Sequence, residues 1–112
     1  MAGLEFDLNV KRDAGGALRI VVRGELDLAT AGQLEAALEA PAEQPVVVDL
    51  RGLTFMDSTG VRTLLQATED SRRDGRDLAF LVPASGDARL TLSETGIEAL
   101  LPILHEPAED GR

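Results

Sequence analysis

The sequence predicts a single α/β domain, with a mixed β-sheet of four to five strands and helices packed on it. Short apolar runs typical of strands alternate along the chain with stretches of helical periodicity, which is the pattern of layered α/β proteins. Of the 112 residues, 44% are hydrophobic and only three are aromatic, so the core must be aliphatic. A chain of this length forms about one domain.

The first two predicted strands lie near the start of the chain. Apolar and polar residues alternate from Leu4 to Lys11, as expected for an edge strand with one face in water. Residues 13–16 (Asp-Ala-Gly-Gly) predict a hairpin turn. Residues 18–26 are more uniformly apolar, which predicts a central strand covered on both faces.

A helix, a buried strand and a second helix come next. Thr30 and Gln33 have the spacing of a capping box and predict a helix over residues 30–40. The β-branched run 46–50 is typical of a buried parallel strand and is the best candidate for the centre of the sheet. A loop is expected to lead from this strand into a helix that begins near Ser58.

The remaining elements repeat this alternation. Gly75 is expected to end the second helix. Residues 78–82 predict another buried strand, and residues 86–96 a third helix closed by a glycine cap, after which Ile97 packs back on the helix. Residues 99–105 predict a short final strand, interrupted by a proline.

The predicted domain spans residues 1–106 and is followed by a disordered polar tail over residues 107–112. The chain begins without the basic and apolar regions of a signal peptide, and no apolar run approaches the length of a bilayer span. We therefore expect a cytoplasmic protein without membrane insertion. The net charge of −9 opposes attraction to phosphate backbones, so no nucleic-acid ligand is expected.

The composition excludes several kinds of catalytic and metal site. Without cysteine and with His105 as the one histidine, the chain cannot form Ser-His-Asp, Cys-His or multi-histidine metal sites. It also lacks the glycine motifs that cradle phosphates. We expect no metal, no cofactor and no enzymatic activity.

Glu25, Asp27 and Asp57 stand at ends of predicted strands, where turn and cap chemistry is the alternative to an acid–base pair. Asp49 is expected to bond nearby backbone.

Residues 57–60 (Asp-Ser-Thr-Gly) mark the start of the second helix. A Ser or Thr at this position is expected to act as an N-cap, worth about 1 kcal/mol. The same geometry exposes a hydroxyl at the positive end of the helix dipole, where free N–H groups would hold a phosphate. A phosphate on Ser58 would add about −1.5 to −2 charges beside Asp57, and beside Glu25 and Asp27 if the strand ends are adjacent.

Three segments resemble the STAS-domain anti-sigma factor antagonists, a bacterial family. They are residues 24–31 (Gly-Glu-Leu-Asp-Leu-Ala-Thr-Ala), 49–53 (Asp-Leu-Arg-Gly-Leu) and 55–61 (Phe-Met-Asp-Ser-Thr-Gly-Val). The resemblance covers about residues 4–105, and its most specific part is Phe-Met-Asp-Ser-Thr-Gly at the start of a helix. It implies the STAS fold, a mixed four- to five-stranded sheet with helices packed on it.

The resemblance also implies a phosphorylation cycle. In this family the unphosphorylated antagonist binds an anti-sigma factor, itself a serine/threonine kinase, and so releases a sigma factor. The kinase phosphorylates a serine of the antagonist, which Ser58 matches, and a serine phosphatase restores it. The residues that the resemblance assigns to partner binding are Glu25, Asp27, Asp57, Ser58, Thr59 and Gly60.

Two alternatives stay open on the sequence. The first is a STAS accessory or scaffold module that is not phosphorylated, in a signalling assembly or in a lipid-transport ABC complex. The second is a receiver domain phosphorylated on aspartate, which requires a lysine late in the chain, whereas Lys11 is the only lysine here. Many family members also continue into a further amphipathic helix, where this sequence has the polar residues 106–112.

Overall fold

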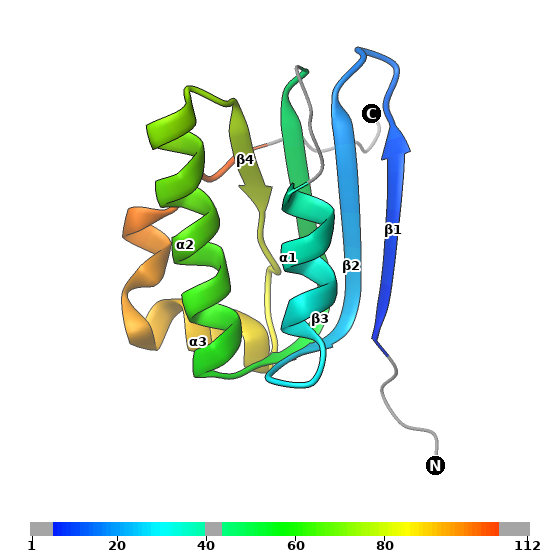
Figure 1. The fold of residues 1–112 in the computed structure, drawn as a ribbon. Coiled ribbons are helices and arrows are strands. Elements are labelled where there is room, and N and C mark those ends of the chain that lie inside the picture. The colour runs from blue at the N-terminus through cyan, green and yellow to red at the C-terminus, as the bar shows by residue number, and fades with distance from the viewer. Residues whose placement is uncertain (1–5, 40–43, 106–112) are drawn as a thin grey trace.

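The computed structural model describes residues 6–39 and 44–105 and has the predicted α/β architecture. Its four strands form one sheet in the order β1-β2-β3-β4, in which β1 is antiparallel to β2 and the other pairs are parallel (Figure 1). The elements are β1 Asp7–Arg12, β2 Leu18–Leu26, α1 Ala31–Glu39, β3 Val46–Met56, α2 Ser58–Asp74, β4 Leu78–Leu81, α3 Asp87–Thr95 and the 3₁₀ helix η1 Ile97–Leu100.

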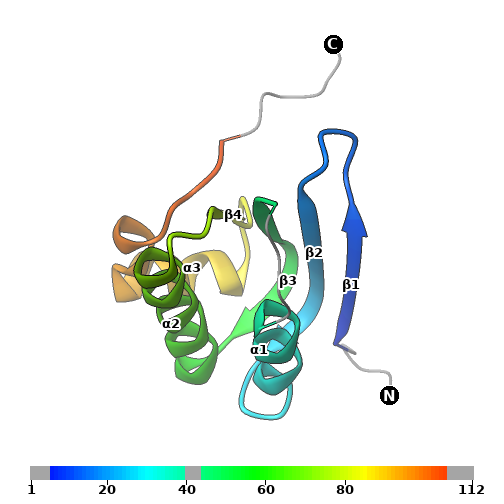
Figure 2. The same cartoon turned by 45° about the horizontal axis from the view of Figure 1, so that its top comes forward.

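Helices α1 and α2 lie side by side over one face of the sheet (Figures 1 and 2). They connect neighbouring parallel strands, and because such crossovers are right-handed, successive ones place their helices on the same face. In β2 the buried side chains Ile20, Val22 and Leu26 alternate with the exposed Arg23. β2 is therefore a central strand, as predicted, but its second face is covered only in part, since Val21 is half-buried there and Arg23 is exposed.

Strand β3 is longer than the predicted strand, because residues 51–56 stay in the sheet instead of forming a loop. They pair with the end of β2, where Glu25 lies opposite Phe55 and Leu26 opposite Met56, after two shifts of register. The sequence pattern assigns this segment to a loop, but pairing with β2 keeps it in the sheet as a strand. As a result, a single residue separates β3 from α2.

The glycine caps are as predicted, but the final strand is not. Gly75 and Gly96 end α2 and α3 with left-handed φ angles of 70° and 73°, which glycine adopts without steric cost. In place of a strand over residues 99–105, the chain forms η1 and then a single parallel bridge between Ile103 and Phe80. The predicted tail, residues 107–112, lies outside the described residues.

The core is aliphatic, as expected, except for Phe80, which is fully buried. Asp49 is only 7% exposed, on the face of β3 away from this core cluster. Its carboxylate accepts hydrogen bonds from Arg51 N, Nε and Nη2 at 3.1, 2.9 and 2.8 Å, and Arg19 Nη1 lies 3.6 Å from Oδ2. Asp49 therefore bonds nearby backbone, as expected, and also two guanidinium groups.

These contacts predict a stability that falls in acid. Burial raises the pKa of Asp49, but the hydrogen bonds from Arg51 and the charges of Arg51 and Arg19 outweigh burial and hold the pKa below its ordinary value of 3.8. The folded state therefore binds fewer protons than the unfolded state around that pH, and the stabilisation, present above the ordinary pKa, is lost as the pH falls through the folded pKa. Urea denaturation should show wild type more stable than Asp49→Asn near neutral pH, with the gap shrinking below about pH 4. A gap independent of pH would contradict this account.

Candidate functional site

The predicted site residues meet at the carboxyl ends of β2 and β3, where α2 begins (Figure 1). The register brings Glu25 opposite Phe55, and the N–H of Asp57 donates to the carbonyl oxygen of Leu26 at 3.3 Å. The condition set by the sequence, that the two strand ends are adjacent, is therefore met. Any charge placed on Ser58 would stand at this shared edge.

Asp57 is the N-cap of α2. Its backbone is extended (φ −104°, ψ −171°), and its Oδ1 accepts hydrogen bonds from the N–H groups of Thr59 at 2.9 Å and Gly60 at 3.1 Å. The prediction that Ser58 or Thr59 caps the helix is wrong, because the strand continues to residue 56 and Asp57 is the last residue outside the helix. The N–H groups expected to be free for a phosphate are already bonded to this carboxylate.

Ser58 is the first residue of α2, and its side chain is exposed. Within residues 6–39 and 44–105 its hydroxyl makes no hydrogen bond, so its modification breaks no internal contact there. Thr59 is half-buried, and its carbonyl oxygen accepts a hydrogen bond from the hydroxyl of Thr63 at 3.0 Å. Of the two hydroxyl-bearing residues in the motif, Ser58 is therefore the more exposed.

Removal of the cap separates the roles of these neighbours. Asp57→Ala is expected to lower the free energy of unfolding by about 1 kcal/mol, because two N–H groups lose their acceptor. Ser58→Ala is the matched control and is expected to change it by a few tenths of a kcal/mol at most. Thermal or urea denaturation measures both. A larger loss for Ser58→Ala than for Asp57→Ala would mean that the serine is the cap after all.

The loop from Asp27 to Thr30 closes the end of β2. The Thr30 hydroxyl donates to the carbonyl oxygen of Glu25 at 2.8 Å and accepts from the N–H of Asp27 at 3.0 Å, while Asp27 Oδ1 accepts from the N–H of Ala29 at 3.0 Å. The predicted capping box is therefore wrong for Thr30, whose hydroxyl bonds the preceding loop and not Gln33. The hydrogen bonds of Asp27 fix the conformation of this loop. Asp27 therefore positions the neighbouring residues at the end of β2.

Two exposed apolar residues at this end of the sheet were missed by the sequence analysis. Leu28 is 80% exposed at the tip of the loop, and Phe55 is 39% exposed at the end of β3. For Leu28, its place inside a polar turn was the signal in the sequence that could have indicated exposure. We call the combined set the Ser58 surface. Its members are Glu25, Asp27, Leu28, Phe55, Asp57, Ser58 and Thr59.

Gly60 is buried and lies where α2 passes closest to β2. A Cβ atom at this position would lie 2.5 Å from Met56 Cγ and 2.8 Å from the carbonyl oxygen of Leu26. Real Cβ atoms essentially never approach so closely. The glycine of the motif therefore permits the close approach of the helix to the sheet that sets the position of Ser58.

The described part of the chain contains no group of three His, Asp or Glu side chains that could hold a metal ion. In the same residues, no helix has both the length and the apolar character needed to cross a membrane. The chemistry offered by the Ser58 surface is thus an accessible hydroxyl, exposed apolar side chains and carboxylates.

Comparison with known families identifies this arrangement. A family model described as "Mlab, STAS domain" matches residues 10–102. The chain belongs to the STAS domain family. The STAS fold and the resemblance to anti-sigma factor antagonists are both confirmed.

Individual relatives agree. The chain is similar to the anti-sigma-F factor antagonist RsfB of Mycobacterium tuberculosis, with 35% identity over 77 residues, 66% of this chain and 61% of that protein. The alignment thus spans less than two thirds of the relative's length. An anti-sigma factor antagonist from Mycobacterium paratuberculosis superimposes with a TM-score of 0.67 and 26% identity, over 95% of this chain and 89% of that one. SpoIIAA in its unphosphorylated form shares the fold, with a TM-score of 0.66 and 24% identity over 95% and 91% of the two chains. Bacillus SpoIIAA in its phosphorylated form also shares the fold, with a TM-score of 0.66 and 20% identity over 93% of this chain and 95% of that one.

Proposed function

We propose that this chain is an anti-sigma factor antagonist controlled by phosphorylation of Ser58. In its unphosphorylated form it binds an anti-sigma factor serine kinase through the Ser58 surface and thereby releases a sigma factor. The kinase then phosphorylates Ser58, which ends the interaction, and a serine phosphatase restores the binding form. The chain acts in the cytoplasm as substrate and ligand, and catalysis belongs to its partners.

The observation that carries the proposal is the exposed hydroxyl of Ser58, without a hydrogen bond among the described residues, at the same end of the sheet as the exposed Leu28 and Phe55. Apolar side chains in water are the usual anchors of a protein interface. A docked partner would remove water from the hydroxyl that it modifies. A phosphate dianion buried there next to Asp57 would cost several kcal/mol of desolvation and repulsion, so the phosphorylated chain would leave the complex.

The test is capture of partners from native cell extract with four baits: wild type, Ser58→Ala, Ser58→Asp and Ser93→Asp. Ser93 is exposed on α3 and is not a member of the Ser58 surface, so the last bait adds the same charge to the same residue type outside that surface. We expect an ATP-binding protein with wild type, Ser58→Ala and Ser93→Asp, and its absence with Ser58→Asp. Incubated with ATP, that protein should add about 80 Da to wild type and nothing to Ser58→Ala.

The same experiment tests the alternative of a STAS accessory or scaffold module. If all four baits retain one partner equally and no phosphate appears on Ser58, the chain is a constitutive binding module and the phosphorylation switch is wrong. Phosphate that is labile to hydroxylamine would instead indicate an aspartyl phosphate, as in a receiver domain.

A further inference from the structure

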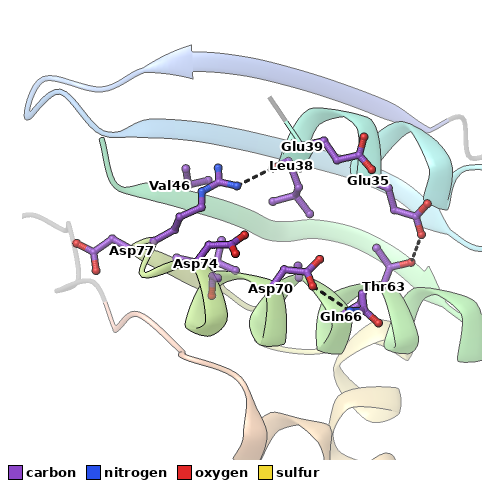
Figure 3. A pocket seen from close by; sticks show the side chains of 13 residues that line it. Glu35, Leu38, Glu39, Val46, Thr63, Gln66, Asp70, Asp74 and Asp77 are labelled. Atoms are coloured by element: carbon purple, nitrogen blue, oxygen red, sulfur yellow. Dashed lines mark hydrogen bonds between the residues drawn. The ribbon is translucent and has the colours of Figure 1, made fainter. Parts of the chain in front are cut away.

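A groove between α1 and α2 runs from Glu35 and Thr63 to the C-terminal ends of both helices, and Ser58 is not part of its lining. Its accessible volume is about 460 Å³, within the usual range for binding pockets. Its floor includes the apolar side chains of Leu38, Val46, Ala67 and Leu78. Figure 3 shows Leu38 and Val46 between side chains from both helices. The groove thus offers apolar side chains that are partly exposed, except for Val46, which is buried.

The rim of the groove is acidic. Glu35 and Glu39 come from α1, Asp70 and Asp74 from α2, and Asp77 from the segment before β4 (Figure 3). The only basic residue of the lining is Arg76, whose Nη1 donates to the carbonyl oxygen of Leu38 at 3.3 Å. The lining residues therefore sum to a net charge of −4 at neutral pH, but Arg73, which is not part of the lining, pairs with Asp70 at 3.1 Å and with Asp74 at 3.4 Å. Glu39 and Asp77 form no ion pair within the described residues.

The backbone adds to this negative potential. α1 follows β2 and α2 follows β3, and because these strands are parallel, the two helices run in the same direction with their C-terminal ends at the same edge of the sheet. A helix C-terminus carries about half a negative charge and favours basic residues. α1 instead ends in Glu39 with no basic residue in its last turn. Among the carboxylates at this edge, Asp74 is paired with Arg73 at 3.4 Å, so Glu39 and Asp77 are the ones that remain for a partner to pair with.

We propose that this groove is a docking site for a basic, amphipathic helical segment of a partner protein. The apolar floor would receive one face of the segment, since amphipathic helices bind by laying an apolar face into a groove. Lysine and arginine side chains beside that face would reach the carboxylates of the rim. The proposal does not depend on the proposed function, because its site and its test leave Ser58 unchanged.

The test uses a synthetic helical peptide of about 14 residues, with leucines at i, i+3 and i+7 and lysine or arginine beside them. Its affinity for the full chain is measured by fluorescence anisotropy, and the bound position by the NMR shift of the Ala67 amide. A scrambled peptide of the same composition and spermine serve as probes of charge alone.

Charge reversal locates the site. The double variant Glu39→Lys/Asp77→Lys should weaken peptide binding by about tenfold or more, since two attractive contacts become repulsive. The control Glu69→Lys/Glu94→Lys makes the same change of net charge at exposed positions on α2 and α3 outside the groove, and should weaken binding by about twofold at most. Melting curves check that both variants fold.

Several results would overturn the proposal. Equal loss of affinity in the two double variants would mean that the peptide responds only to net charge. Equal binding of the scrambled peptide would remove the role of the apolar floor. If spermine alone reproduces the shift of the Ala67 amide and displaces the peptide, the groove is a site for small cations. If the basic peptide leaves that amide unshifted, the groove is no docking site for such a helix.

Discussion

Gly60→Ala is expected to lower the free energy of unfolding by about 2–3 kcal/mol. The new methyl group would lie 2.5 Å from Met56 Cγ and 2.8 Å from the carbonyl oxygen of Leu26. The Met56 side chain is buried and cannot move into solvent, and the carbonyl belongs to the backbone of β2. α2 must therefore shift away from the sheet, although alanine is the better helix former.

Gly32→Ala is the matched control, because Gly32 also lies in the first turn of a helix but has no atom within 4 Å of its added Cβ. There the substitution removes only the entropic cost of glycine and should stabilise the chain by about 0.5–1 kcal/mol. Urea denaturation measures both variants. Opposite signs are expected, and a stabilising or neutral effect of Gly60→Ala would show that α2 does not depend on this close approach.

The elements that the sequence predicts well are those in which local pattern and tertiary environment agree. The β-branched run 46–50 is buried as a strand because both neighbours in the sheet are parallel strands. Gly75 and Gly96 end helices because their left-handed backbone is costly for other residues. In these places a single local rule decides the structure.

The secondary structure was predicted wrongly where it depends on pairing with a segment distant in the sequence. Residues 51–56 read as a loop, because Gly52 interrupts them and their pattern does not alternate regularly, yet they pair with the end of β2 through two register shifts. Conversely, residues 99–105 contain apolar residues but gain only one bridge to Phe80, since Pro102 has no N–H to donate. No property of either segment alone reveals its partner.

The adjacency of the strand ends was predicted, but the contacts of the side chains there were not. Adjacent strand ends follow from parallel topology, so Glu25 and Asp57 could be grouped in advance. The N-cap residue could not be chosen in advance. Asp57, Ser58 and Thr59 all favour that position, and the end of β3 at Met56 decides that Asp57 occupies it. The exposure of Phe55 likewise depends on which face of β3 the helices leave open.

Phosphorylation of Ser58 is expected to weaken binding to the proposed anti-sigma kinase by about two to three orders of magnitude, or about 3–4 kcal/mol. The free energy of unfolding of the chain alone should change by less than about 1 kcal/mol, because the helix dipole offsets part of the repulsion from Asp57. The reason for the difference is that water solvates the exposed phosphate in the free chain, whereas the interface excludes that water. Calorimetric titration of the captured partner and urea denaturation measure the two quantities on the same phosphorylated sample.

Asp57→Asn separates the repulsion between Asp57 and the phosphate from the desolvation of the phosphate in the complex. Asparagine keeps an oxygen for the N–H groups of Thr59 and Gly60 and caps helices as well as aspartate does, but it removes the charge beside the phosphate. The phosphorylated variant should therefore be more stable than phosphorylated wild type, while its binding to the partner stays weak, because the dianion would still lose its water in the complex. If Asp57→Asn instead restores most of the affinity of the phosphorylated chain, repulsion by Asp57 and not desolvation of the phosphate drives the release. If phosphorylation unfolds wild type, the loss of binding reflects damage to the fold, and the switch does not act at the surface.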